Sequence, residues 1–287
     1  MTSANTIQST INYIKKELKE LYHARETESM AYILLEYVLN YSKTQIQLNR
    51  TENITEDHFK QIDAYTQELK TSKPIQYILG ETEFYGLTFK VNEYTLIPRQ
   101  ETEELVHAII NENQQKGLHI LDIGTGSGCI PVSLAKNLQN AHVSSADISS
   151  EAIEKAKENA LLNQVDINFF HRDILNWKKF DWADFDIIVS NPPYVTEAEK
   201  SKMEKNVLDY EPHTALFVSD HDPLIFYRTI AEFALQYLKQ NGKLYFEINE
   251  SLGHEMVELL KKYKFSNIHL LADINGKNRM VSAIKLH

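Results

Sequence analysis

Ile187-Ile188-Val189-Ser190-Asn191-Pro192-Pro193-Tyr194 has the character of a buried β-strand that ends in a rigid polar loop. The apolar, β-branched residues 187–189 are typical of a central parallel strand that is covered on both faces. Pro192 and Pro193 remove two backbone donors and fix φ at about −65°, so the strand cannot continue through them. The chain is therefore expected to turn at Asn191.

This loop carries polar groups that suit a planar substrate. The Asn191 side chain has one acceptor and two donors, and the Pro192 carbonyl adds a second acceptor. Two converging acceptors beside the Tyr194 ring can hold an NH2 group and present its nitrogen to an electrophile. A bare Asn-Pro pair more often only closes a strand. The complete four-residue loop after a buried strand favours a functional role, provided that an electrophile lies nearby.

The composition fits a folded protein with one domain of ordinary size and a smaller one. The chain has 287 residues, of which 43% are hydrophobic and 24% charged. A net charge of −10 and the lack of a dense Lys/Arg block disfavour nucleic acid as the substrate. Cys129 is the only cysteine, which excludes an internal disulfide. The single cysteine makes a reducing cytoplasm the expected location. The sequence also has no apolar run of about 18 residues and no secretory signal at its start.

Residues 1–73 are predicted to form a separate N-terminal helical domain. Thr55, followed by two acids, resembles a helix cap. Both a plain helical bundle and a substrate-docking domain fit this region, because it carries no cluster of reactive side chains. Apolar residues recur at helical spacing along three segments: Ile7, Ile11, Ile14, Leu18 and Leu21; then Ile33, Leu34, Tyr37, Val38 and Tyr41, between about 28 and 41; then Phe59, Ile62, Tyr65 and Leu69.

Residues 74–99 are predicted to form a linker that contains a β-hairpin. Apolar and polar residues alternate along residues 83–91, as expected for paired strands. Pro98 ends the extended segment, and the acids of residues 101–104 then begin a helix, where the helix dipole favours negative charge. That electrostatic effect is sufficient to explain these acids without a catalytic role.

Residues 100–287 are predicted to form an α/β domain. Strands and helices alternate from Leu118 onward, which is typical of a parallel sheet with helices on both faces. The predicted strands are 118–123, 142–147, 167–171, 185–190, 243–248, 267–272 and 279–285. The predicted helices between them are about 128–138, 149–163, 223–240 and 251–263.

A glycine loop, Gly124-Thr125-Gly126-Ser127-Gly128, joins the first of these strands to a helix. Glycines allow positive φ and close approach of a ligand to the backbone, and the helix N-terminus behind them is mildly positive. The signal is only moderate on its own, because several nucleotide-binding folds use glycine-rich turns here and the later glycine of the dinucleotide motif is missing.

Two acids follow the next two strands, at the same edge of the sheet. A carboxylate at Asp147 can accept both hydroxyls of a ribose, although a helix cap shared with Ser149 is the alternative. Asp173 can accept an adenine amino group, although an acid in a loop is also ordinary. An adenosine cofactor beside a loop that holds an amide fits methyl transfer from a sulfonium to nitrogen better than hydride transfer. In-line positioning of an already charged donor needs neither a metal nor a covalent nucleophile.

The chain resembles the S-adenosylmethionine-dependent N-methyltransferases, through Asn191-Pro192-Pro193-Tyr194 and the glycine loop together. Three further stretches resemble the peptide chain release factor N5-glutamine methyltransferases, the HemK/PrmC family: Gly80-Glu81-Thr82-Glu83-Phe84-Tyr85-Gly86, Leu96-Ile97-Pro98-Arg99-Gln100-Glu101-Thr102-Glu103, and, more loosely, Glu211-Pro212-His213-Thr214-Ala215-Leu216. The resemblance covers residues 74–287. It implies a seven-stranded Rossmann-like methyltransferase domain, a small N-terminal helical-bundle domain and a β-hairpin linker between them.

The family implies methylation of the glutamine in the Gly-Gly-Gln motif of class 1 release factors, with the helical domain docking that partner. By position, Asn191, Pro192 and Tyr194 would be catalytic. Asn191, Pro192, Pro193, Tyr194, Arg99 and Glu101 would contact the substrate. The cofactor S-adenosyl-L-methionine would contact Gly124, Thr125, Gly126, Ser127, Gly128, Asp147, Asp173, Ile174 and Asn191.

Two other functions fit parts of the sequence. An adenine-N6 or guanine-N2 nucleic-acid methylase uses the same loop on a base, but the acidic balance and residues 98–103 speak against it. A non-catalytic cofactor-binding scaffold would not need the complete Asn-Pro-Pro-Tyr loop. The irregular spacing of His213, Asp220, His221 and Asp222 matches no metal site, and Cys129 reads as a packing residue. We expect a monomer that binds no metal, does not associate with a membrane and has no direct nucleic-acid substrate.

Overall fold

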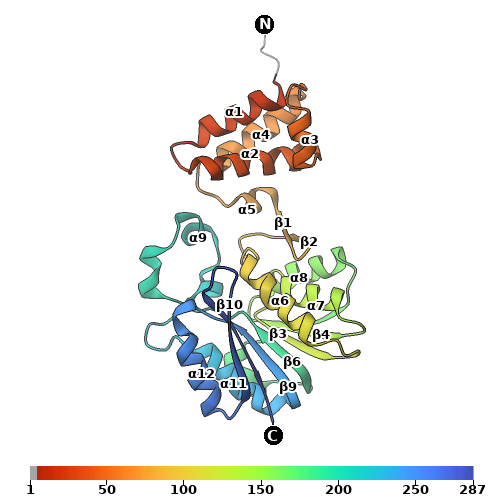
Figure 1. Cartoon of the computed structure of the whole chain (residues 1–287), viewed down its shortest axis with the longest axis vertical. Coiled ribbons are helices and arrows are strands. Elements are labelled where there is room, and N and C mark those ends of the chain that lie inside the picture. Colours follow the sequence, from red (N-terminus) through yellow and green to blue (C-terminus); the bar gives the residue numbers. More distant parts are fainter. Residues whose placement is uncertain (1–4, 287) are drawn as a thin grey trace. The chain divides into compact units, whose positions relative to one another are not determined.

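The computed structural model describes residues 5–286, which form two compact units (Figure 1). The first unit runs through Gly80 and also takes in Glu204–Tyr210 from much later in the chain. The second unit consists of Glu81–Met203 and the chain from Glu211 onward. Residues 1–4 and 287, which the predicted domain ranges include, lie outside the described part.

The first unit is a helical bundle around a core of its own. Thr6 and Thr55 cap α1 and α4, accepting from Ser9 N and His58 N at 3.1 Å, so the cap predicted at Thr55 is confirmed. The later segment is fixed to this unit by Tyr210, whose hydroxyl donates to the carbonyl of Thr71 at 2.9 Å. The helices are α1 (Ile7–Leu18), α2 (Ala24–Leu39), α3 (Lys43–Leu48), α4 (Glu56–Leu69), α5 (Ile75–Leu79) and, from the later segment, α9 (Lys205–Tyr210).

Two details of the predicted helical faces are wrong. Leu21 is 53% exposed, because α1 ends at Leu18 and Leu21 lies in the following turn. Ile33 and Tyr37 are each 38% exposed. The buried side of α2 is instead formed by Thr27, Ala31, Tyr32, Leu34 and Leu35. In such an apolar stretch, two adjacent faces of the helix both carry apolar residues at helical spacing. Packing against neighbouring helices then decides which face is buried.

The second unit is built on a seven-stranded sheet, and all seven predicted strands are present. The strands are β3 (His119–Ile123), β4 (His142–Asp147), β5 (Ile167–His171), β6 (Phe185–Ser190), β9 (Leu238–Glu247), β10 (Ser266–Ala272) and β11 (Asn278–Ile284), in the order β10-β11-β9-β6-β3-β4-β5. β11 runs antiparallel to β9 and β10, which corrects the expectation of a parallel sheet. The reason is that a short turn, not a helix, joins β10 to β11.

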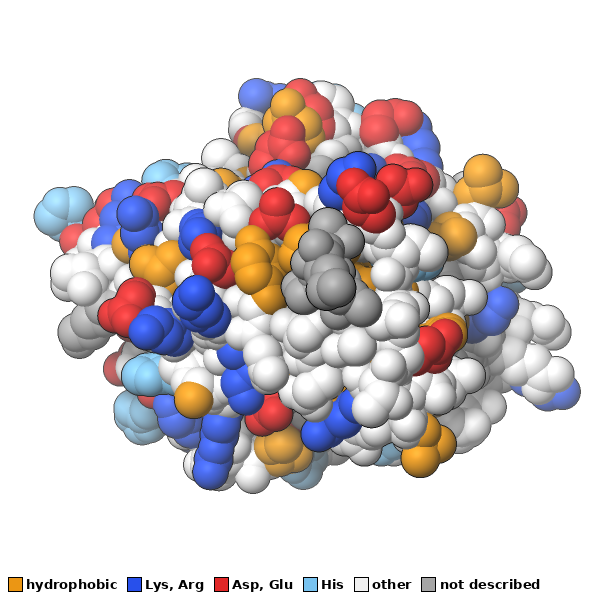
Figure 2. Space-filling model, turned by 90° about the horizontal axis from the view of Figure 1, so that it is seen from above, with side chains coloured by type: hydrophobic (Ala, Val, Ile, Leu, Met, Phe, Trp, Pro, Cys, Tyr) orange, Lys and Arg blue, Asp and Glu red, His pale blue; other side chains and the backbone are white. Residues whose placement is uncertain are grey.

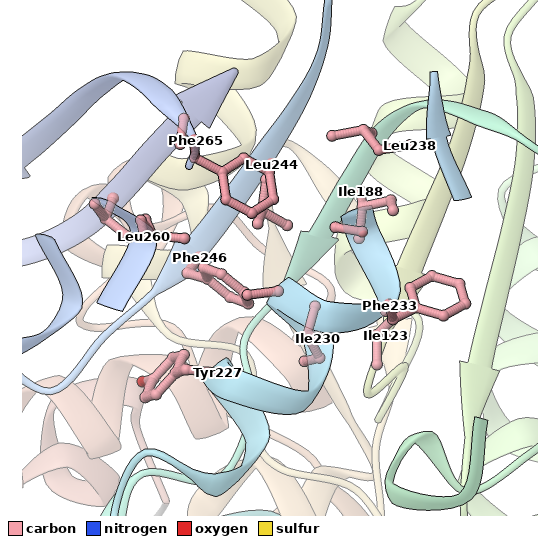
Figure 3. Packing of buried hydrophobic residues seen from close by; sticks show 14 of the residues in the cluster. Ile123, Ile188, Tyr227, Ile230, Phe233, Leu238, Leu244, Phe246, Leu260 and Phe265 are labelled. Carbon is pink, nitrogen blue, oxygen red and sulfur yellow. The ribbon is translucent and has the colours of Figure 1, made fainter. Parts of the chain in front are cut away.

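Helices cover both faces of this sheet, as the alternation predicted. Neighbouring residues of β6 point to opposite sides: Ile187 and Val189 pack with α6, α7 and α8, whereas Ile188 packs with α11 and α12. Figure 3 shows the second of these clusters, with Tyr227 and Phe233 of α11 packed against the strands. The helices are α6 (Gln100–Glu112), α7 (Cys129–Asn137), α8 (Ser150–Leu162), α11 (Ile225–Tyr237) and α12 (Gly253–Lys262).

Shorter elements complete the second unit. The predicted hairpin is confirmed as β1 (Glu81–Phe84) paired antiparallel with β2 (Leu87–Lys90). After β6, two short parallel strands, β7 (Val195–Thr196) and β8 (Phe217–Val218), pair with each other. The remaining helical turns are η1 (Ile174–Lys179), η2 (Glu197–Lys202), α10 (His213–Leu216) and η3 (Glu250–Leu252).

Charges of opposite sign are mixed on the surface. Lys60 Nζ lies 2.8 Å from Glu56, and Lys157 Nζ lies 2.7 Å from Glu154. Figure 2 shows the same mixing, with Lys/Arg and Asp/Glu side chains interspersed across the face in view. Within residues 5–286, every helix falls short of the length and apolar character needed to span a membrane.

Candidate active site

A cavity of about 390 Å³ lies where the order of the strands reverses. The chain moves from β3 to β4 and β5 on one side, then returns to β6 and β9 on the other. In open α/β sheets, ligands bind at this point, beyond the carboxyl ends of the strands. Most of the predicted site residues line the cavity, namely Arg99, Gly124, Thr125, Gly126, Ser127, Asp147, Asp173, Ile174, Asn191, Pro192 and Pro193.

The glycine loop and the loop after β6 lie against each other. Gly124 has a φ of +86°, and a Cβ atom added there would lie 3.7 Å from the carbonyl oxygen of Asn191. A glycine therefore suits the backbone conformation, whereas the 3.7 Å spacing alone would be an ordinary van der Waals contact. The turn is held from the next strand, because Gly126 N donates to Asp147 Oδ2 at 2.9 Å.

Gly128 is placed differently from its neighbours and does not line the cavity. Its φ is +82°, and an added Cβ would lie 3.0 Å from the Cβ of Ala156. Gly128 therefore allows the start of α7 to approach α8 closely.

Asp147 and Asp173 line the cavity while also binding backbone groups. Asp147 Oδ1 accepts from Ser149 N at 2.9 Å, whereas Ser149 itself caps α8. Asp173 caps η1, accepting from Leu175 N at 2.8 Å and from Asn176 Nδ2 at 2.6 Å. Burial raises the pKa of Asp147. The alternative interpretation of a structural acid is compatible with ligand binding, because each carboxylate oxygen has two lone pairs.

A fully buried acid, Asp122 of β3, lies two residues before the glycine loop. Its Oδ2 accepts from Ser145 at 2.6 Å and from Thr125 at 3.1 Å, whereas Oδ1 is buried without a partner in the described structure. Burial raises the pKa of Asp122 to about 7. Asp122 does not line the cavity, but the two acids that do, Asp147 and Asp173, suit a cationic adenosine cofactor in an otherwise largely apolar cavity of this size.

A smaller cavity of about 50 Å³ adjoins the larger one at the loop after β6. Its walls include the Asn191 and Pro192 corner and the partly buried Tyr194. Five residues line both cavities: Leu96, Arg99, Asn191, Pro192 and Ala215. A group in the smaller cavity would therefore lie directly beside a ligand in the larger one.

Arg99 is fixed at this junction by a buried acid. Its guanidinium donates to Glu211 Oε1 at 2.5 Å, and Ile97 N donates to Glu211 Oε2 at 3.3 Å. Glu101, also predicted to contact the substrate, lines neither cavity; it lies in the first turn of α6.

Some lining residues were missed from the sequence. Tyr94, Thr214, Ala215, Phe217 and Phe226 line the larger cavity without having been assigned a role. The stretch Glu211–Leu216, which resembles the family, contains two of these residues, Thr214 and Ala215. Tyr94, Phe217 and Phe226 had no local signal, since only the fold brings them to the cavity.

The buried Cys129 also lines the cavity, but its chemistry does not suit a nucleophile. Burial raises the pKa of its thiol to about 12, so the reactive thiolate is disfavoured at neutral pH. Among the described residues, His, Cys, Asp and Glu side chains do not gather in groups of three or more that could hold a metal ion.

Two sequence families match the chain. Residues 100–210 match the methyltransferase small domain, and residues 9–80 match the PrmC N-terminal domain. A release factor glutamine methyltransferase from Flavobacterium psychrophilum is 52% identical over 268 residues, covering 92% of this chain and 94% of that protein. One from Bacteroides thetaiotaomicron is 41% identical over 271 residues, covering 94% of this chain and 97% of that protein.

Solved structures share the fold at low sequence identity. A methyltransferase from Pyrococcus furiosus has a TM-score of 0.53 and 17% identity, covering 81% of this chain and 100% of that one. A 16S rRNA N2 G1207 methyltransferase from T. thermophilus, solved with AdoMet and guanosine, has a TM-score of 0.51 and 18% identity, covering 71% and 49%. At these identities, the likeness concerns the fold alone.

Proposed function

The chain belongs to the family of release factor glutamine methyltransferases, and from that premise we propose how its site performs the reaction. The enzyme methylates the side-chain amide nitrogen, N5, of a glutamine in peptide chain release factors. The glutamine is that of the Gly-Gly-Gln motif of class 1 release factors, and the reaction takes place in the cytoplasm. The observation that carries the proposal is the junction of the two cavities at Asn191 and Pro192.

The larger cavity is the proposed site of S-adenosyl-L-methionine, which supplies a methyl group on a positively charged sulfur. Gly124, Thr125 and Gly126 line this cavity, and Asp147 binds the ribose hydroxyls with its remaining lone pairs. Asp173 and Ile174 border the adenine. The negative charge of Asp147 and the apolar walls favour a cationic, partly apolar ligand.

The smaller cavity is the proposed site of the glutamine side chain. Asn191 Oδ1 and the Pro192 carbonyl accept from the glutamine NH2, and Tyr194 packs beside the amide. Arg99, held by Glu211, lies at the same junction and contacts the substrate. Pro192 and Pro193 restrict the backbone, so the two acceptors keep their spacing while the substrate binds.

These acceptors also address the chemical difficulty of the reaction. An amide nitrogen is a weak nucleophile, because its lone pair is delocalised into the carbonyl. Two hydrogen bonds from NH2 to Asn191 and Pro192 draw electron density toward the nitrogen and favour its pyramidal form. This stabilisation is greatest in the transition state, where it accelerates the reaction.

The first unit is the proposed docking surface for the release factor. A Gly-Gly-Gln loop alone offers few contacts, so a separate domain supplies the affinity for the rest of the substrate. Methylation of an adenine or guanine base remains the alternative, since the same loop could hold a base. The net charge of −10 and the mixed surface charges favour the protein substrate.

Replacing Asn191 with Ala tests whether its side chain holds the glutamine amide for reaction. We expect turnover on a release factor to fall by roughly 10²-fold or more, as when one positioned hydrogen-bond partner is removed from an active site. Mass spectrometry would count methyl groups on the Gly-Gly-Gln glutamine, and calorimetry with S-adenosylmethionine would show whether the cofactor still binds.

Asn137→Ala is the matched control, since among the described residues the Asn137 amide donates within α7, to Ser133 O at 2.8 Å. Near-normal turnover of correctly folded Asn191→Ala would remove Asn191 from the mechanism. Methylation of DNA or RNA, but not of a release factor, by the unmodified enzyme would replace the proposed substrate with the alternative.

A further inference from the structure

A buried glutamate is connected to Asn191 by hydrogen bonds. Glu247, at the end of β9, is 1% exposed. Its Oε2 accepts from the hydroxyl of Thr102 at 2.6 Å, and its Oε1 accepts from the hydroxyl of Tyr194 at 3.2 Å. Both carboxylate oxygens are therefore used, one by Thr102 of the larger cavity and one by Tyr194 of the smaller cavity.

Thr102 continues this chain of hydrogen bonds to Asn191. The Asn191 amide nitrogen donates to Thr102 Oγ1 at 3.3 Å. Thr102 lines the larger cavity at the start of α6, and it lies 145 positions from Glu247 in the sequence. The chain thus runs from an acid on β9, through a hydroxyl on α6, to the amide that follows β6.

The direction of these hydrogen bonds is determined at Glu247. A threonine hydroxyl has one proton, and that proton is donated to the carboxylate. Toward Asn191, Thr102 can then only accept. Asn191 must present its NH2 to Thr102, so its Oδ1 is left as the group that can face a ligand.

We propose that Thr102 and Glu247 are positioning residues, which orient the Asn191 side chain so that its oxygen accepts from the glutamine NH2. This inference rests on the proposed function and extends it beyond the Asn-Pro-Pro-Tyr loop. Without the hydroxyl, the Asn191 amide can rotate by half a turn and present NH2 to NH2. That arrangement offers two donors and no acceptor, so it cannot hold the substrate for reaction.

The carboxylate form of Glu247 suits this role, because it offers only acceptors to Thr102 and Tyr194. Burial raises the pKa of Glu247, whereas the hydrogen bonds from Thr102 and Tyr194 and the nearby charge of Arg279 act against that rise. An ionised carboxylate can only accept, so it fixes the direction of both hydrogen bonds. Tyr194 is held by the same acid, and a single buried group therefore orients two walls of the smaller cavity.

The test compares Thr102→Val, which removes the hydroxyl at nearly constant shape, with Thr102→Ser, which keeps it. Thr66→Val is the matched control, because Thr66 is also fully buried but donates to Ile62 O inside α4. The measurements are kcat, the KM for the release factor, the Kd for S-adenosylmethionine and Tm.

We expect Thr102→Val to lower kcat by about tenfold or more, the effect of losing one well-placed hydrogen bond. The Kd for the cofactor stays unchanged, and Tm falls by no more than in Thr66→Val. Thr102→Ser stays within about threefold of the unmodified enzyme. The proposal is overturned if Thr102→Val keeps its kcat, if Thr102→Ser is equally slow, or if the loss follows weaker cofactor binding.

Glu247→Met adds an independent test, because it removes the acceptor at the start of the chain. If the two residues act in sequence, the double variant is no slower than the slower single variant. Multiplied losses would mean separate roles and reject the chain. Should Glu247→Met not fold, the Thr102 series decides by itself. Failure of the unmodified enzyme to methylate any release factor would instead count against the proposed function.

Discussion

Gly128 combines a left-handed backbone with a close helix contact. Its φ is +82°, and an added Cβ would lie 3.0 Å from the Cβ of Ala156. We expect Gly128→Ala to lower the free energy of unfolding through both effects. A non-glycine residue at positive φ costs about 1–2 kcal/mol, and overpacking of the helix contact adds roughly 1 kcal/mol or more.

Gly276→Ala separates the two contributions. Gly276 has a similar φ of +78°, but an added Cβ would meet no atom within 4 Å. Urea unfolding of both variants should show the larger loss for Gly128→Ala. Equal losses would mean that the approach to Ala156 is not restrictive.

Asp122 makes stability depend on pH. Burial raises its pKa from 3.8 to about 7, so between these values the folded protein binds more protons than the unfolded chain. The contribution of Asp122 is therefore fully present below about pH 4 and is lost as the pH rises through about 7. We expect the Tm of the Asp122→Asn variant, relative to the unmodified protein, to increase between pH 5 and about pH 8.

Thermal unfolding of the two proteins at several pH values measures this difference. The shift of about 3 units corresponds to roughly 4 kcal/mol as an upper limit. A difference in Tm that is independent of pH would show that Asp122 does not titrate in this range.

Among the elements, α8 connects the hairpin to the glycine loop through Asn159. Its Oδ1 accepts from Lys90 N at 2.7 Å, and its Nδ2 donates to Lys90 O at 2.9 Å and to Ser127 O at 2.8 Å. Asn159→Ala removes all three hydrogen bonds from a fully buried site. We expect a loss of about 2–4 kcal/mol in stability and weaker binding of S-adenosylmethionine, measured by urea unfolding and calorimetry.

Asn163, the residue after the last turn of α8, is the control for this variant. Its amide donates to Thr88 O in the same hairpin and to Asn159 O, both at 2.9 Å, and neither of these hydrogen bonds involves the glycine loop. Asn163→Ala should lower stability while leaving cofactor affinity unchanged. If both variants lose the same affinity for S-adenosylmethionine, the loss comes from the contact with the hairpin and not from the hydrogen bond to Ser127.

The longer helices and strands could be predicted because the pattern of apolar residues along each of them indicates which side is buried. Residues 187–189 form an apolar run that a strand covered on both faces requires, and the helices around the sheet are long enough to show a 3.6-residue period. The six residues of α3 and the five of α5 are too short for that period to appear. Only the capping box of Ser42 and Gln45 marked α3 locally.

The supporting residues of the site could not be predicted in the same way. Asn191 and the glycine loop carry local motifs, whereas Thr102 and Glu247 become neighbours only through the order of the strands. Thr102 also lies within a run of acids that the helix dipole explains sufficiently. A polar residue ending an apolar strand, as Glu247 does, was the available signal.

For the whole molecule, docking of the release factor on the first unit predicts that the size of the substrate affects its binding more than it affects the rate of the methyl-transfer step. A short peptide with Gly-Gly-Gln presents the same amide to Asn191 but cannot reach a separate surface. We expect its KM to exceed that of an intact release factor by about tenfold or more, since lost contacts with the remote part weaken uniform binding. The kcat values should remain similar. Steady-state kinetics with both substrates measures this, and equal KM values would argue against docking.

The path of the chain has a consequence for recombination between related genes. Glu204–Tyr210 packs with the first unit, although the residues before and after it belong to the second. A single crossover near residue 80 would therefore combine a bundle from one parent with its seven-residue insert from the other. Functional hybrids need two exchanged gene segments, so this bundle is inherited as a pair of separated pieces and not as one interchangeable cassette.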